Sequence, residues 1–519
     1  MKMGVFCDTI SATEHPIIYT MWKYGGEFMS MIDEKVLWAS ADKLRGSIGA
    51  SDYMHIVLGL IFLKFISDRF EEKYAQLVSE GDGFENDKDE YIAEHIFWVP
   101  ENARWNYIST FSKQEEIGQK LDEAFILIEK ENEELQGILP KIYSSSTVDK
   151  RRLGELIDLF SNQLETTAEG DFMGQVYEYF MNKFARSLGQ AGGEFYTPRC
   201  IVKLLVKMIQ PLNGRVYDPC CGSGGMFVQA ADFVKAHQGN VDMISVYGQE
   251  FNSVTWKLAK MNLAIRGIDA NLGDAPGDTF HDDKHKAQRF DYILANPPFN
   301  ISDYGQPSIT EDPRWIYDVP PAGNANYAWI QHMYSKLAPK GIAGFVLANG
   351  SLSTTNKQEY NIRKGMLEDG VVDCIITLPD KLFYTTGIPV SLWFIRKNKT
   401  NKNVLFIDAR NMGEMIDRKV RELKDDDLEL ISNTYHTWSS NDGYEDKKGF
   451  CKSASLEEIR EADYTLVPGR YVGIDDSNKM SEEEIEEEIR KVSTELLTLF
   501  DESKELEEKV KQILQENIK

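Results

Sequence analysis

The chain has 519 residues, which is enough for two or three domains with sizeable cores. Its 42% hydrophobic and 27% charged residues are ordinary for a soluble globular protein. The net charge of -25 excludes a DNA-binding surface spread over the whole chain, because non-specific affinity for DNA comes from Lys and Arg that neutralise phosphates. Any contact with DNA must therefore use a local basic groove or a more basic partner.

The first elements give no sign of a membrane or secretion signal. Residues 1–30 show no clear hydrophobic period, and we interpret them as an N-terminal extension. Asp8 and Glu14 interrupt what would be the apolar core of a signal peptide. The most apolar run, residues 56–66, contains Lys64 and is much shorter than the roughly 20 residues of a membrane span, so it predicts a buried helix. The cysteines form no CxxC pair and no zinc spacing, which favours reduced thiols in the cytoplasm and predicts no metal site.

Residues 31–187 have the pattern of an all-helical N-terminal domain. Ser51 is placed as an N-cap before the apolar run, and residues 121–128 and 153–160 have helical spacing. Strand signals are few in this part of the chain. We therefore predict a domain built from helices alone.

The pattern changes near residue 188, where short β-rich runs begin to alternate with helical ones. This alternation predicts a catalytic domain, residues 188–400, with a mostly parallel, doubly wound α/β sheet. Such sheets bind ligands at the carboxyl ends of their strands, so the chemistry is expected there. The predicted strands are residues 215–218, 245–250, 290–295, 342–348, 371–378 and 390–396.

The remainder divides into a polar, mixed region, residues 401–480, and a patterned tail, residues 481–519. Apolar residues in the tail step by four and three in turn, which is a heptad seam with one polar position. Either this helix packs on its own domain or it joins a partner helix, and the narrow seam with charged flanks favours a partner. The seam comprises Ile485, Ile489, Val492, Leu496, Leu499, Ser503, Leu506, Val510 and Ile513.

The most specific motif is Asn296-Pro297-Pro298-Phe299, directly after the predicted strand 290–295. An exocyclic amine such as adenine N6 is a weak nucleophile, and two acceptors aimed at its hydrogens would help it become pyramidal. The side-chain oxygen of Asn296 and the carbonyl of Pro297 can supply them, and the prolines hold that carbonyl rigidly. Phe299 offers an aromatic face for an extruded base. The alternative is a simple turn that ends a strand, since Asn-Pro is a common turn starter.

A glycine-rich turn follows the predicted strand 215–218. It runs from Asp218 through Gly222, Ser223, Gly224 and Gly225. Glycines here allow the backbone to approach a ligand without a Cβ clash. No Lys-Ser or Lys-Thr pair follows, so a phosphate-binding P-loop is not expected. A tight turn without a ligand is the alternative.

Three weaker signals accompany these motifs. Glu250 ends the next predicted strand and could accept both hydroxyls of a ribose. Asp274 follows a further short run and could accept from an adenine amino group. Upstream, the segment 193–199 reads Gly-Glu-Phe-Tyr-Thr-Pro-Arg and predicts a rigid loop, although by composition it could equally be an interdomain linker.

In combination, GEFYTP, DPCCGSGG, GQE and NPPF resemble the motifs of γ-class amino-methyltransferases of DNA. They look most like the modification subunit of type I restriction-modification systems, over about residues 33–397. The resemblance implies an α/β fold: a Rossmann-like S-adenosylmethionine-dependent methyltransferase domain with an α-helical N-terminal domain and a C-terminal coiled-coil-like helix. It implies S-adenosyl-L-methionine as the cofactor and N6 of adenine in double-stranded DNA as the methyl acceptor.

The same resemblance assigns two sets of site residues. The residues that would grip the target adenine are Asn296, Pro297, Pro298 and Phe299. Those that would line the cofactor are Glu194, Phe195, Tyr196, Thr197, Pro198, Arg199, Asp218, Gly222, Ser223, Gly224, Gly225, Glu250 and Asp274.

The resemblance also implies partners. The sequence after Lys397 is largely acidic or heptad-patterned and has little basic surface for reading bases. Sequence specificity would then come from a specificity subunit with long helices, bound by two modification subunits, and a restriction subunit would join the full complex. Methylation by such a complex protects host DNA from the cognate restriction activity.

Alternatives remain at this point. The methyl acceptor could instead be cytosine N4, RNA or a protein glutamine, because Asn-Pro-Pro-aromatic motifs serve these too. A non-enzymatic scaffold that retains the fold is a further alternative, which the intact motifs disfavour. His281 and His285 have the spacing of helical metal ligands, but their polar surroundings favour a solvated loop.

Overall fold

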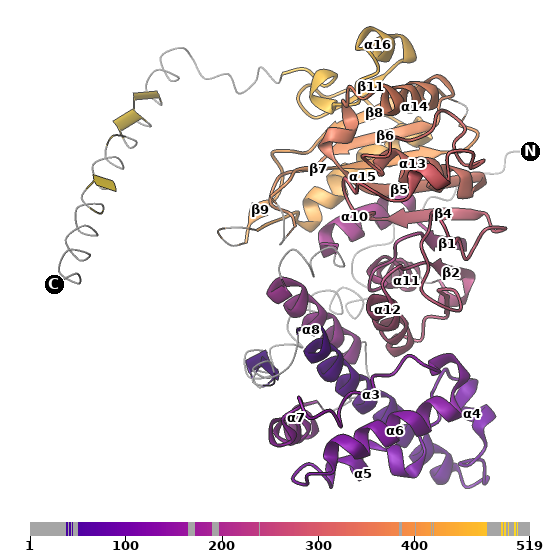
Figure 1. Ribbon diagram of the computed structural model, residues 1–519. Coiled ribbons are helices and arrows are strands. Elements are labelled where there is room, and N and C mark those ends of the chain that lie inside the picture. Colours follow the sequence, from indigo (N-terminus) through magenta and orange to yellow (C-terminus); the bar gives the residue numbers. More distant parts are fainter. Residues whose placement is uncertain are drawn as a thin grey trace, which may run out of the picture.

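The computed structural model describes residues 50–164, 172–188, 197–237, 239–383, 387–399, 401–416 and 420–474, together with single positions elsewhere (Figure 1). The predicted N-terminal extension, residues 1–30, lies outside the described residues. So does the predicted heptad helix, residues 481–519, apart from scattered positions. The fold described below is therefore that of the helical region and the catalytic domain.

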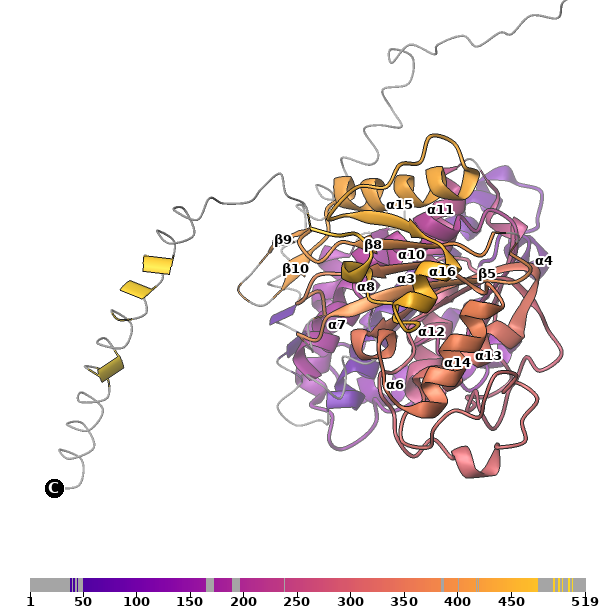
Figure 2. The same ribbon diagram turned by 90° about the horizontal axis from the view of Figure 1, so that it is seen from above.

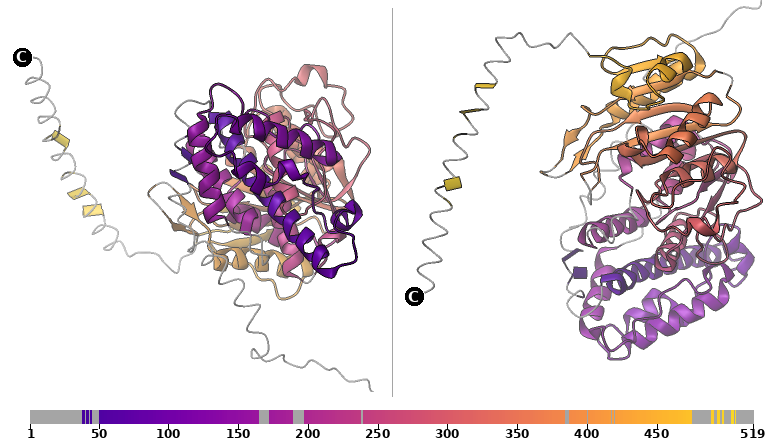
Figure 3. Two further views of the ribbon diagram at one scale, coloured as in Figure 1. Left: turned by 90° about the horizontal axis from the view of Figure 1, so that it is seen from below. Right: turned by 45° about the horizontal axis from the view of Figure 1, so that its top comes forward.

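Every element described between residues 50 and 188 is helical, as the sequence predicts. The longest helix, α3 (Ala50–Glu80), contains the apolar run 56–66, which is buried in the core. Figures 1 and 3 show the helical region as a group that lies against one end of the catalytic domain. The other helices are α4 (Lys88–Ile92), α5 (Trp105–Ser109), α6 (Ile117–Glu131), α7 (Lys150–Gln163) and α8 (Phe172–Leu188), with short 3-10 turns at Glu101–Ala103 and Glu133–Leu135.

Helix α7 shows how the local sequence sets these helices. The Asp149 carboxylate caps the helix by accepting from the backbone N–H of Arg152 at 3.1 Å. Leu153, Ile157 and Phe160 then recur on one face, and all three are buried. A helix of this length gains its stability from burying that face against its neighbours.

The catalytic domain is built on a nine-stranded sheet with the order β11-β8-β6-β7-β5-β4-β1-β2-β3. Neighbours from β3 to β5 are parallel, as are β6 and β8, whereas β7 runs antiparallel to both β5 and β6. This confirms the predicted mostly parallel α/β sheet. The strands are β1 (Gly214–Asp218), β2 (Ile244–Gly248), β3 (Ala270–Asn271), β4 (Phe290–Ala295), β5 (Leu337–Ala348), β6 (Val372–Thr377), β7 (Val390–Arg396), β8 (Val404–Asp408) and β11 (Cys451–Ala454).

Helices cover both faces of this sheet. Successive strand residues point to opposite faces, so Val216 joins one core cluster and Tyr217 the other. Figure 2 shows α10, α11 and α15 on one side and α13 and α14 on the other. The described helices of this domain are α10 (Arg199–Ile209), α11 (Gly225–Ala236), α12 (Ser253–Ile265), α13 (Asn326–Lys336), α14 (Lys357–Glu368), α15 (Asp425–Ser440) and the short α16 (Leu456–Glu461). Burial on both faces explains why the central strands are apolar along their length.

The sheet continues beyond residue 400, where the predicted catalytic domain ends. Strand β8 pairs parallel with β6, and β11 pairs antiparallel with β8. A two-stranded hairpin of β9 (Glu414–Met415) and β10 (Arg421–Glu422) stands apart from the main sheet. Much of the predicted mixed region therefore completes the catalytic domain.

Among the described helices, none is long and apolar enough to cross a membrane. The loop that carries His281 and His285 differs from the solvated loop predicted for it. His281 is exposed, but the His285 ring is buried and bonds the Gly248 carbonyl at 2.8 Å. Aromatic rings of Tyr217 and Tyr247 surround it, and burial lowers its pKa. His285 thus fixes the loop to the sheet.

Candidate active site

The glycine-rich turn joins β1 to α11 at the carboxyl edge of the sheet. Gly222 and Gly224 have φ angles of 54° and 82°, a region that favours glycine. Gly224 begins α11 without a side-chain cap, and a Cβ at the exposed Gly225 would meet nothing within 4 Å. The turn therefore presents open backbone at a helix N-terminus, where a ligand can approach closely.

Two carboxylates hold this turn through backbone N–H groups. Glu250 accepts from Gly222 at 3.1 Å with one oxygen and from Asn252 at 2.8 Å with the other. Asp218 accepts from the backbone N–H of Cys220 at 2.9 Å. Both carboxylates are buried, so the structure brings these two predicted residues together at the ends of β1 and β2.

Burial makes both carboxyl groups weaker acids than usual. It raises the pKa of Asp218 to about 7, although the bond from Cys220 opposes the shift. Burial also raises the pKa of Glu250, against the lowering effect of its backbone N–H partners. A cationic ligand placed beside them would favour their ionised forms.

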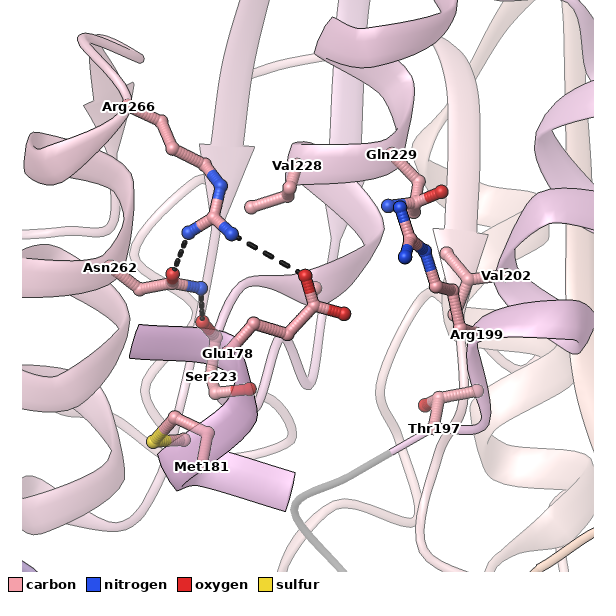
Figure 4. A pocket seen from close by; sticks show the side chains of 11 residues that line it. Glu178, Met181, Thr197, Arg199, Val202, Ser223, Val228, Gln229, Asn262 and Arg266 are labelled. Atoms are coloured by element: carbon pink, nitrogen blue, oxygen red, sulfur yellow. Dashed lines mark hydrogen bonds and ion pairs between the residues drawn. The ribbon is translucent and has the colours of Figure 1, made fainter. Parts of the chain in front are cut away.

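A pocket lies beside the turn, between α8, α10, α11 and α12 (Figure 4). The Asn262 amide donates to the Ser223 carbonyl at 2.7 Å, and Arg266 donates to the Asn262 side-chain oxygen. Arg266 also pairs with Glu178 of α8 at 3.4 Å. Arg199 reaches the pocket from its opposite side. The helical region is thereby connected to the glycine-rich turn by polar contacts.

At the end of β4, Asn296 is held by a residue from a distant part of the sequence. Its side-chain nitrogen donates to the Thr197 hydroxyl at 3.0 Å. Its side-chain oxygen is buried and has no hydrogen-bond partner among the described residues. A buried acceptor without a partner costs free energy, about 1–3 kcal/mol in typical cases, so it calls for an explanation.

Phe299 lies three residues after Asn296, at the end of the same motif. It is half-buried and contacts Phe383 edge to face, with ring centroids 6.0 Å apart. The turn after it is fixed, because Asn300 and Asn326 exchange bonds of 2.9 and 3.0 Å. Sequence reasoning missed Phe383 and Asn326, and the signal was weak because each lies outside the motif.

Not all the predicted residues come together. Asp274 has an exposed side chain, 88% accessible, and pairs with Lys284 at 3.4 Å. Thr197 and Arg199 both line the pocket beside the turn, and the Thr197 hydroxyl also accepts the hydrogen bond from Asn296. Glu194, Phe195 and Tyr196 lie outside the described residues.

A doubly wound sheet with a glycine-rich turn after β1 and Asn-Pro-Pro-Phe after β4 defines a Rossmann-like methyltransferase. The N-6 DNA Methylase family matches residues 168–483, and the HsdM N-terminal domain matches residues 34–160. The chain belongs to the N-6 DNA methylase family, as the modification subunit of a type I restriction-modification system. It is thus an adenine-specific DNA methyltransferase, as the resemblance predicts.

Known proteins support this over most of the chain. The type I restriction enzyme HindI methylase subunit of Haemophilus influenzae is 46% identical over 398 residues, covering 72% of this chain and 90% of the relative. The MjaIX methylase subunit of Methanocaldococcus jannaschii is 38% identical over 514 residues, covering 93% and 90%. The crystal structure of the type I methyltransferase subunit from Streptococcus thermophilus has a TM-score of 0.73 and 27% identity, and covers 84% of this chain and 98% of that one.

Proposed function

We propose that this chain methylates N6 of an adenine extruded from double-stranded DNA, within a complex whose specificity subunit selects the site. The observation that carries the proposal is the buried side-chain oxygen of Asn296, which has no partner among the described residues. An amino group on a flipped base would supply the missing donor. The bond from Asn296 nitrogen to Thr197 turns this oxygen away from the hydroxyl and leaves it available.

The surrounding residues suit an extruded base. The Pro297 carbonyl would be the second acceptor for the N6 hydrogens, held by the rigid backbone of the Pro297-Pro298 pair. The rings of Phe299 and Phe383 would pack against the purine. Two acceptors on N6 draw its hydrogens out of the ring plane, which makes the lone pair available. Positioning of this kind supplies most of the acceleration we expect.

The residues around the glycine-rich turn, here called the cofactor half of the site, fit S-adenosylmethionine in their acceptors and their open backbone. The open backbone at Gly225 admits a ligand, and the buried carboxylates of Asp218 and Glu250 suit hydroxyls and a cationic group. Phe251, 74% exposed directly after Glu250, offers a face for the adenine ring of the cofactor. When bound, the cofactor supplies a methyl group on a sulfonium, a strong leaving centre. These residues bind and orient it and exclude water.

The remaining predicted cofactor residues differ in where they lie relative to the glycine-rich turn. Gly222, Ser223 and Gly224 form the turn itself, with Arg199 across the pocket. We propose Asp274 only as a residue at the rim, because its side chain is exposed and paired with Lys284.

We also propose that partners complete the enzyme. The related proteins are named as methylase subunits, which implies assembly with other chains. Ile489 and Leu506, two positions of the predicted seam, are exposed at 59% and 61%. A specificity subunit with long helices would cover this seam, with two modification subunits for each. A restriction subunit would join the full complex, and methylation would protect host DNA in the cytoplasm.

The test is labelled methyl transfer to duplex DNA, with and without the specificity subunit, followed by digestion to nucleosides. We expect N6-methyladenine only when the partner is present. Label in DNA without the partner would mean that this chain selects sequences by itself. Label in RNA or protein instead of DNA would overturn the proposed acceptor.

Removal of residues 481–519 tests the partner assignment separately. The truncated chain should still bind S-adenosylmethionine, because the described cofactor residues all precede residue 280. It should no longer copurify with the specificity subunit. A truncated chain that assembles normally would refute the role proposed for the seam.

A further inference from the structure

The hairpin formed by β9 and β10 is the feature that the proposed chemistry does not use. Its strands pair through Met415 opposite Arg421, and the Ile416 N–H donates to the Val420 carbonyl at 2.9 Å. Figures 1 and 2 show it projecting from the edge of the catalytic domain. We define residues 411–424 as the projecting hairpin.

The base of the projecting hairpin is attached to the loop that carries Phe383. The Arg421 N–H donates to the Lys381 carbonyl at 2.8 Å, two residues before Phe383 in the chain. The Arg421 guanidinium also donates to the carbonyls of Met412 and Gly413, at 3.2 and 3.0 Å. Since Phe383 contacts Phe299, the loop that supports the hairpin also reaches the Asn-Pro-Pro-Phe motif.

A second attachment joins the end of the hairpin to α10. Leu423 is buried in the core cluster that contains most of α10, and Lys203 of α10 pairs with Asp425 at 3.4 Å. Helix α10 begins two residues after Thr197, which holds Asn296. The base of the hairpin is therefore connected to the loop of Phe383, which contacts Phe299, and to the helix that follows Thr197, which holds Asn296.

The exposed end of this hairpin has a composition unlike the rest of the chain. Met415 and Ile416 are 42% and 46% exposed, and Arg418 is exposed beside them. Residues 411–424 carry four basic and three acidic side chains, whereas the whole chain has a net charge of -25. A two-stranded hairpin gains little stability from exposed apolar residues, so this pair suits contact with another molecule.

We propose that the projecting hairpin enters the DNA next to the target adenine, with Met415 and Ile416 against the opened base step and Arg418 on the phosphate backbone. The proposal rests on the proposed function. Extrusion of a base leaves a gap in the stack, and apolar side chains inserted between base steps fill such gaps in other DNA complexes. The basic side chains of the hairpin outnumber its acidic ones in a chain whose net charge is -25, and this favours DNA over a protein as the partner of the hairpin.

The test uses the chain assembled with its specificity subunit and amplified genomic DNA, which carries no methylation and contains the site whatever its sequence. The double variant M415A/I416A should lower the methyl-transfer rate at least tenfold. It should also lose permanganate reactivity at the thymines left unpaired by extrusion. Affinity for S-adenosylmethionine should not change, and M415L/I416L should restore transfer.

A matched control is Leu430→Ala, which removes an apolar side chain of similar exposure, 44%, from α15. It should leave transfer and thymine reactivity unchanged. Arg418→Ala should weaken DNA binding and lower the slope of log affinity against log salt by about one, since one phosphate contact is lost.

The outcomes distinguish a failure of the proposed function from a failure of the role proposed for the hairpin. No transfer to DNA by the unaltered complex overturns the proposed function and this proposal with it. Equal transfer by the unaltered complex and by M415A/I416A overturns the hairpin proposal alone. Loss of the specificity subunit from the double variant would assign the hairpin to a protein interface instead.

Discussion

The carboxyl edge of the sheet has two halves, and they differ in how their polar atoms are used. In the cofactor half, both oxygens of Glu250 and one of Asp218 accept from backbone N–H groups of the loops that follow β1 and β2. In the target half, the Asn296 oxygen is buried without a partner among the described residues. The cofactor half is thus complete before any ligand binds, whereas the target half would be completed by its substrate.

The two halves should respond differently when a ligand binds. Preformed carboxylates hold the glycine-rich turn in shape and permit binding with little rearrangement. An orphaned acceptor raises the energy of the target half without its substrate, and a donor that pairs with it recovers that energy. Substitutions should therefore separate cofactor binding from transfer according to the half they touch.

The largest expected effect is in the target half. Asn296→Ala should lower methyl transfer by about 10²–10³-fold or more, because it removes an acceptor aimed at N6. Cofactor affinity, measured by calorimetry, should stay within about twofold, since Asn296 contacts Thr197 and not the turn. Asn433→Ala, an exposed position on α15, is the control and should change neither quantity. Equal losses in both measurements would remove the division between the halves.

The next largest effect belongs to the cofactor half. Glu250→Ala leaves the Gly222 and Asn252 N–H groups without their carboxylate. Bonds to a charged group contribute roughly 1.5–3 kcal/mol, so cofactor affinity should fall about ten- to a hundredfold. Transfer should recover at saturating cofactor, and Glu250→Gln should lie between the two. An unchanged Kd would contradict the role of this carboxylate.

A smaller effect is expected from the two aromatic rings of the target half, Phe299 and Phe383. Phe299→Ala should slow transfer by an amount that corresponds to roughly 1–3 kcal/mol of lost base stacking. Phe383→Ala should act on the same contact, so the two losses should not add in a double-mutant cycle. Additive losses would mean that the two rings do not share one substrate. Unchanged turnover of Phe299→Ala on duplex DNA would reject the stacking role.

The sequence predicts the sheet far better than it predicts the pocket, for a physical reason. Residues 290–295 and 390–396 match β4 and β7 to the residue, because these buried strands are largely apolar and have clear breakers beside them. The predicted strand 342–348 is too short, since β5 already begins at Leu337, before the turn-like Pro339 and Gly341. Local patterns also left β8 and β11 outside the sheet, because strand pairing is a tertiary property.

Contacts between distant segments explain the rest of the difference. Thr197 and Asn296 are 99 residues apart, and no local spacing indicates their hydrogen bond. Phe383 reaches Phe299 only because β6 and β7 place its loop at the same edge. Motifs could name Asn296 and Phe299, but the partner of each depends on the three-dimensional fold.

The smallest expected effect is a pH dependence confined to the cofactor half. Burial raises the pKa of Asp218 to about 7, so this carboxyl is mainly protonated at pH 6 and mainly ionised at pH 8. A sulfonium cofactor prefers the ionised form, so its affinity should rise with pH across this window, by about tenfold at most for a single group. Calorimetry at pH 6 and pH 8 measures the change, and Asp218→Asn should show a smaller change between the two values because its amide does not titrate. Equal affinity of the unaltered chain at the two pH values would show that Asp218 does not interact with the charge of the cofactor. The Asn296→Ala variant should keep the full dependence, because the orphaned oxygen and the buried carboxyl belong to different halves of the edge.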